Sequence, residues 1–180
     1  MRGIKEDTMQ IRLATLRDLD DLMPLFEEAR GTIAALGIDQ WQDGYPSRPV
    51  IEEDIRLGRS YVVEIDTDIV GTFVLVDDGE VTYNEIFGGR WLTGDARVCH
   101  YVAIHRVAVA VARRGSGIST AIMDYATAHA RALGRASLRI DTHEGNVVMR
   151  RMLEKHGFTL CGEIKLLSGA PRVAYERVLD

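Results

Sequence analysis

Two kinds of hydrophobic pattern alternate along this chain of 180 residues. Apolar residues recur at helical spacing after Thr15, Pro49, Gly117 and Asn146, so a helix is predicted to follow each of these positions. Runs rich in β-branched and aromatic residues predict strands at 11–13, 61–65, 69–76, 81–87, 98–111, 137–141, 159–166 and 172–178. This order predicts an α+β fold, in which helices flank a central mixed sheet that is mostly antiparallel.

The boundaries of these elements come from glycine, proline and turn residues. Gly31 is predicted to end the first helix, with a second short helix over 32–36 and an aromatic loop over 41–46. The strand, helix and strand between 107 and 141 should form a right-handed crossover with parallel strands. Residues 1–8 form a polar lead-in in this interpretation. Residues 9–180 form a single domain, because no linker, repeat or low-complexity run divides them.

The composition narrows the class of protein. With 46% hydrophobic and 27% charged residues, the chain has the make-up of a soluble globular protein. It contains no apolar run long enough to cross a bilayer, and its start lacks the apolar core of a signal peptide, so we expect a cytoplasmic protein without a membrane partner. A net charge of −5 disfavours a general nucleic-acid binder. Cys99 and Cys161 are expected to be inert thiols, and no Cys/His spacing predicts a metal site.

A glycine turn joins the apolar strand that ends at residue 111 to the next helix. Glycines permit close backbone approach, and the free N–H groups of a helix's first turn bind anionic oxygen, so phosphate is the expected ligand. A P-loop is excluded, because no lysine lies between Gly115 and Thr120. A dinucleotide fingerprint fits better, with Asp141 near the position of a ribose-binding acid, but Thr120 replaces its third glycine. A nucleotide-binding oxidoreductase is therefore a minor alternative.

The sequence Arg114-Gly115-Ser116-Gly117-Ile118-Ser119 resembles the coenzyme A loop of the GNAT family of N-acetyltransferases, whose signature is Arg/Gln-x-x-Gly-x-Gly/Ala after a strand. Ser119 departs from it, although serine is also small. A second family signature, an asparagine followed by a helix that ends in Gly-Phe, is similar to Asn146 through Gly157 and Phe158. The resemblance covers 104–158 specifically. It implies the acetyltransferase fold and acetyl-CoA as co-substrate.

The resemblance also implies which residues hold the donor. Main-chain groups of one strand would bind the pantetheine arm and the acetyl carbonyl, namely those of Val107, Ala108 and Val109. The diphosphate would lie on the amides of the loop and first helical turn, beside the side chain of Arg114, namely those of Gly115, Ser116, Gly117, Ile118, Ser119 and Thr120. The side chain of Asn146 would reach the same molecule.

The acid and the base of the reaction are less clearly marked. Several family members place a tyrosine acid seven residues after the asparagine, where this chain has Leu153, and some carry a base five residues before it, at Asp141. A carboxylate is a weak base for an ammonium group unless burial or a water relay helps. His143 and His105 are alternative bases, since imidazole titrates nearer neutral pH. Each also has a structural interpretation, as a turn cap or as a residue facing either side of the sheet. Glu85 is a weaker candidate for the same role. The acceptor pocket could be lined by the aromatic residues Trp41, Tyr45, Tyr83 and Trp91.

Taken together, these features predict an enzyme that moves an acetyl group from acetyl-CoA to a primary amine of a small molecule or peptide, by direct attack in a ternary complex. The acidic net charge hints at a cationic acceptor. A homodimer is possible by analogy with the family. The alternative, suggested by Leu153, is a non-catalytic acyl-CoA-binding module of the same fold.

Overall fold

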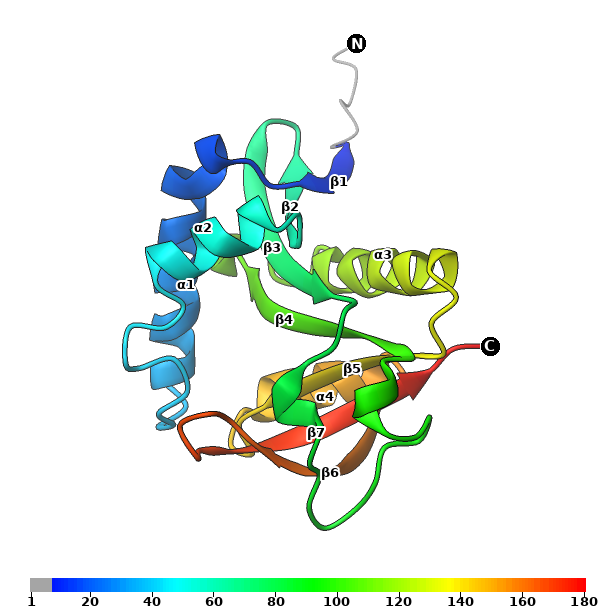
Figure 1. Cartoon of the computed structure of the whole chain (residues 1–180). Helices are drawn as coiled ribbons and strands as arrows, with labels where there is room; N and C mark the ends of the chain where they lie inside the picture. The colour runs from blue at the N-terminus through cyan, green and yellow to red at the C-terminus, as the bar shows by residue number, and fades with distance from the viewer. Residues whose placement is uncertain (1–7) are drawn as a thin grey trace.

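The computed structural model describes residues 8–180 (Figure 1), so the predicted lead-in lies outside the described residues except for Thr8. One seven-stranded sheet runs through the structure in the order β1-β2-β3-β4-β5-β7-β6. Only β4 and β5 are parallel, and all other neighbours are antiparallel. The strands are β1 (Met9–Leu13), β2 (Ser60–Ile65), β3 (Asp68–Val76), β4 (Tyr101–Val109), β5 (Ser137–Thr142), β6 (Thr159–Lys165) and β7 (Pro171–Val178). This confirms the predicted fold class.

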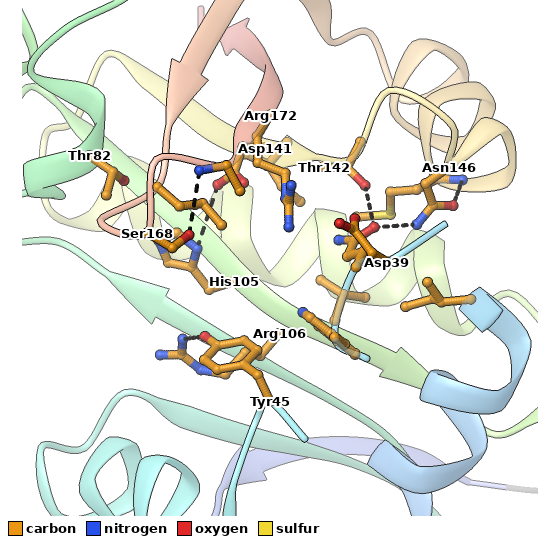
Figure 2. A pocket seen from close by; sticks show the side chains of 18 of the residues that line it. Asp39, Tyr45, Thr82, His105, Arg106, Asp141, Thr142, Asn146, Ser168 and Arg172 are labelled. Carbon is orange, nitrogen blue, oxygen red and sulfur yellow. Dashed lines mark hydrogen bonds and ion pairs between the residues drawn. The ribbon is translucent and has the colours of Figure 1, made fainter. Parts of the chain in front are cut away.

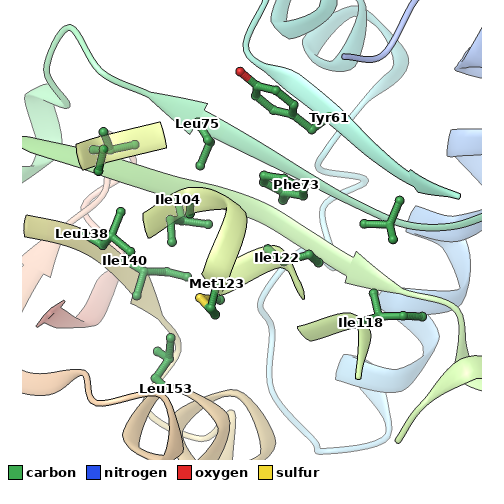
Figure 3. Close-up of a cluster of buried hydrophobic side chains, with 14 of the residues drawn as sticks. Tyr61, Phe73, Leu75, Ile104, Ile118, Ile122, Met123, Leu138, Ile140 and Leu153 are labelled. Carbon is green, nitrogen blue, oxygen red and sulfur yellow. The ribbon is translucent and has the colours of Figure 1, made fainter. Parts of the chain in front are cut away.

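Four helices cover the two faces of the sheet. They are α1 (Leu19–Ala34), α2 (Arg48–Arg56), α3 (Ile118–Ala132) and α4 (Val147–Lys155). On β2, neighbouring residues point to opposite faces: Val62 packs with α1 and α2, and Val63 packs with α3. Figure 1 shows the two helix pairs on opposite sides, and Figure 3 shows the α3 side, where Leu153 of α4 joins the largest buried cluster.

The strand predicted over 81–87 is wrong. Its first part is a short 3₁₀ helix, Val81–Tyr83, and Phe87 makes only an isolated bridge to Glu163 of β6. The segment instead covers the face of the sheet that α1 and α2 leave open, where Tyr83 and Trp91 are buried and the indole N–H donates to the carbonyl of Tyr83 at 2.9 Å. The next strand also starts later than predicted, at residue 101, because Cys99 adopts a left-handed conformation with φ 49°.

Gly31 does not end the first helix as predicted. Helix α1 continues through it to Ala34, and the separate short helix predicted over 32–36 is mainly the last turn of α1. A glycine inside a helix costs about 1 kcal/mol, and burial of Phe26 and Ile33 on the same helix outweighs that amount.

Gly89 marks a close crossing between this covering segment and β6. A Cβ at this position would lie 1.9 Å from the carbonyl oxygen of Cys161. We expect Gly89→Ala to lower the free energy of unfolding by about 1–3 kcal/mol, because the segment must move away from β6. Urea denaturation measures the effect. Gly31→Ala is the control, since a Cβ there meets nothing within 4 Å and alanine should stabilise the helix. Equal stability of Gly89→Ala and the natural chain would contradict the crossing.

Candidate active site

The site begins where the two parallel strands separate. Residues 101–103 of β4 pair with 137–139 of β5, but beyond them β4 stays with β3 while β5 stays with β7 (Figure 1). One edge of β4 therefore has no strand partner after Ala103. A cavity of about 810 Å³ lies at this divergence, lined by residues of both strands, of α4, of the loop after α1 and of the β6–β7 loop.

Arg139 fixes the last point at which the two strands pair. Its side chain is 1% exposed, and its Nε donates to Oε1 of Glu176 at 2.8 Å. The guanidinium carbon lies 4.3 Å from the ring centre of Trp91 and 4.2 Å from that of Tyr101. Because a buried guanidinium is stable only when charge and ring faces surround it, this arrangement holds the strands at a fixed separation.

A bulge in β4 lies at the wall of the cavity. The register between β3 and β4 shifts between Thr72 and Val74, and Arg106 takes φ 52°, which is uncommon outside glycine. Its guanidinium makes two hydrogen bonds of 2.7 Å to Asp54 of α2 and another to the hydroxyl of Tyr45. These contacts maintain the bulge, and they tie the aromatic loop after α1 to the strand.

Four titratable side chains meet beside the bulge. Nε2 of His105 lies 3.1 Å from Oε2 of Glu80, without hydrogen-bond alignment. Its Nδ1 lies 4.0 Å from Oδ1 of Asp141 (Figure 2). The same Asp141 oxygen accepts a hydrogen bond of 2.8 Å from the hydroxyl of Tyr83. The imidazole is therefore flanked by two carboxylates.

The neighbours of Glu80 in this cluster lower the pKa of its carboxyl group. Burial alone would raise that pKa, but His105 and the hydrogen bonds from the amide and hydroxyl of Thr82 outweigh it and lower it to about 2. Burial, together with Asp141, raises the pKa of Tyr83 well above its usual value. Glu80 is thus a carboxylate and Tyr83 a neutral donor at every ordinary pH.

Asn146 and His143, both singled out in the sequence, have different surroundings. Asn146 lines the cavity, and its Oδ1 accepts from the amide of Met149 at 3.2 Å, which caps α4. Its Nδ2 donates to Gln40 at 3.1 Å. His143 does not line the cavity, and its Nδ1 accepts from the amide of Gly145 at 2.9 Å. The structure therefore gives His143 the contacts of a turn cap.

The glycine turn follows β4 and opens α3. Gly115 and Gly117 take φ 80° and 81°, and a Cβ on either would meet no atom within 4 Å. No side chain caps the first turn of α3, so its N–H groups are free to bind an anion. Arg114 lies beside the loop, where it donates to Thr32 at 3.0 Å. These features fit the diphosphate of a coenzyme A molecule.

The other residues that the sequence singled out lie either in the cavity wall or outside it. Trp41 and Tyr45 line the cavity, whereas Tyr83 and Trp91 are buried beside it and Glu85 is exposed away from it. Among the residues of the cavity wall that sequence reasoning missed are Gln40, Glu80, Arg106 and Arg172. None of them belongs to a motif.

Residues 8–180 contain neither a metal-type cluster of side chains nor a membrane-spanning helix. Within them, no group of three or more His, Cys, Asp or Glu side chains has an arrangement suited to a metal ion. The helices of the same region are all too short or too polar to span a bilayer. Cys161 is buried, which raises the pKa of its thiol to about 11.

Comparison with known proteins gives consistent matches over most of the chain. A family model described as the acetyltransferase (GNAT) family matches residues 19–158. A GNAT-family acetyltransferase structure from Streptococcus agalactiae is 37% identical, with 96% of each chain covered and a TM-score of 0.83. One from Listeria monocytogenes is 21% identical, with 95% of each chain covered and a TM-score of 0.71. The PaiA N-acetyltransferase of Thermoplasma acidophilum, solved in complex with coenzyme A, is 15% identical, with 96% of this chain and 99% of that one covered and a TM-score of 0.70. A search of curated proteins found no match.

Proposed function

This chain belongs to the acetyltransferase (GNAT) family, and we propose that it transfers an acetyl group from acetyl-CoA to a primary amine of a small molecule or peptide. The observation that carries the proposal is the unpaired edge of β4. It starts at the divergence from β5, passes the bulge at Arg106 and leads directly to the open glycine loop. An extended thioester carrier with a diphosphate at its far end needs such a path.

The donor would be held mainly by backbone groups. The edge of β4 over 107–109 would pair with the amides of the pantetheine arm, and the amides over 115–120 would hold the diphosphate. Ser119 does not interfere with this role, because the role depends on main-chain N–H groups. The side-chain amide of Asn146 makes two hydrogen bonds within the protein and has capacity for more, so it can also contact the donor.

His105 is the base in this proposal. When bound, acetyl-CoA supplies a thioester carbonyl open to attack and a thiolate that leaves readily. The acceptor reaches the cavity as an ammonium group, and His105 removes its proton. Asp141, oriented by the hydroxyl of Tyr83, and the ionised Glu80 stabilise the resulting imidazolium. In this proposal, main-chain N–H groups of the bulge would stabilise negative charge on the carbonyl oxygen.

Leu153 cannot supply a proton, because its side chain is a hydrocarbon; the structure buries it fully under the sheet. This is a modest loss, since a thiol has a pKa of about 8.5 and its thiolate is stable enough to leave unaided. A leucine at position 153 is also the reason to keep a second candidate function, a module that binds acyl-CoA without catalysis. Release of free thiol in the presence of an amine distinguishes the two functions.

Thermal unfolding with ligands tests the proposal. Coenzyme A or acetyl-CoA at a hundredfold excess over its dissociation constant should raise the melting temperature by about 5–10 °C, because only the folded chain binds it. NAD at the same concentration should leave it unchanged. A free-thiol reagent then follows turnover of acetyl-CoA with a panel of amines. A shift with NAD and none with coenzyme A would refute the assignment.

A further inference from the structure

Arg172 is a buried cation that the reaction described above does not use. It lies near the start of β7, is 9% exposed and lines the cavity. Figure 2 shows its guanidinium extending from β7 toward the space that His105 and Asp141 also face. Its one hydrogen bond runs from Nη1 to the carbonyl oxygen of its neighbour Pro171, at 2.7 Å.

The other deeply buried guanidinium groups differ in their partners. Arg106 pairs with Asp54 and Arg139 with Glu176, each at hydrogen-bond distance. Over residues 8–180, no carboxylate comes within ion-pair distance of Arg172. Four of the five N–H donors of Arg172 have no protein partner in this part of the chain, so they are available to a ligand in the cavity. An anionic group in the cavity would give this cation a counter-ion.

The donor does not supply that anion. None of the residues 111–120, where the diphosphate is expected, lines the cavity that holds Arg172. The pantetheine arm, which is the part of coenzyme A that enters the divergence of β4 and β5, carries no charge. The partner of Arg172 therefore belongs to the acceptor.

The part of the cavity wall around His105 suits an amine. Glu80 and Asp141 flank His105 there, and both carboxylates are only 21% and 13% exposed. Apolar side chains of Trp41, Met149 and Leu166 also face the cavity. Resting on the function proposed above, we propose that the acceptor is an amino-acid-like molecule, whose carboxylate binds Arg172 while its amine lies beside His105. This refines the cationic acceptor that the net charge suggested.

Calorimetric binding of matched ligand pairs tests this inference. The ligands are the common amino acids and, for leucine, methionine and phenylalanine, the amines that lack the carboxylate. They are titrated into the natural chain and into Arg172→Gln, both with coenzyme A present. We expect at least one amino acid to bind the natural chain, and Arg172→Gln to weaken it about 10- to 100-fold, as for loss of a charged hydrogen-bonded pair. Amines without the carboxylate should bind both chains equally.

Two further variants and one parallel measurement complete the test. Arg172→Lys should retain part of the affinity, and Arg177→Gln, on the same strand but outside the cavity, should retain all of it. Melting temperatures with coenzyme A report the donor site separately, so loss of that shift in the natural chain would refute the proposed function alone. If no amino acid binds the natural chain, or if amines without a carboxylate bind as tightly, the inference is overturned.

Discussion

Replacement of His105 by glutamine is expected to lower turnover about 100- to 10,000-fold, which is the range for loss of a general base. Glutamine has a similar size and can form hydrogen bonds, but it cannot take a proton from the ammonium group. The KM for acetyl-CoA should change little, because the proposed donor site consists of backbone groups on β4 and the glycine loop. Thiol release under saturating acetyl-CoA measures both constants.

Three controls make the result specific to the imidazole at residue 105. His129→Gln changes a half-buried histidine on α3, outside the cavity, and should leave the rate unchanged. His143→Gln should have a small effect, since that ring caps a turn. Asp141→Asn should reduce the rate less than the change at His105. If His143→Gln were the more damaging variant, the proposed base would be wrong.

The pH dependence of the rate also bears on this base. The pKa of Glu80 is lowered to about 2. A folded-state value below the unfolded one means that its carboxylate stabilises the fold above pH of about 4.5 and loses this effect as pH falls toward 2. Any rate change observed between pH 5 and 9 therefore does not come from Glu80.

Replacement of Gly117 by tryptophan is expected to weaken coenzyme A binding by about 100-fold or more, because it would remove at least two charge-assisted hydrogen bonds to the diphosphate. The indole would project into space that no protein atom occupies within 4 Å of the Cβ. The variant should thus fold and yet block the approach of the ligand. The shift in melting temperature with coenzyme A measures the loss.

Gly134→Trp is the matched control for backbone strain. Gly134 follows the other end of α3, with φ 65° and an equally open Cβ position. Both variants force tryptophan into a left-handed conformation, which costs about 1–3 kcal/mol. Only the change at Gly117 should reduce the response to coenzyme A. Equal responses in both variants would remove the glycine loop from the donor site.

The parts of the site that the sequence predicted are those built from local signals. The glycine turn, the helix that follows it and the cap at Asn146 each depend on a few neighbouring residues, and the structure has all three. The covering segment after Glu80 was mistaken for a strand, because its apolar residues serve a sheet face that only the folded chain creates. Arg106 and Arg172 were missed for a similar reason: their burial depends on contacts with distant segments.

The separation of β4 and β5 bears on the rate at which the proposed donor, acetyl-CoA, can associate with the protein. The gap exists in the free chain, and it starts directly after the pair formed by Ala103 and Arg139. In the proposed binding mode, the carrier would therefore enter without breaking hydrogen bonds between the two strands and without a slow isomerisation. Because the slot is already ordered in the free chain, binding of the proposed thioester carrier would not include the cost of ordering it.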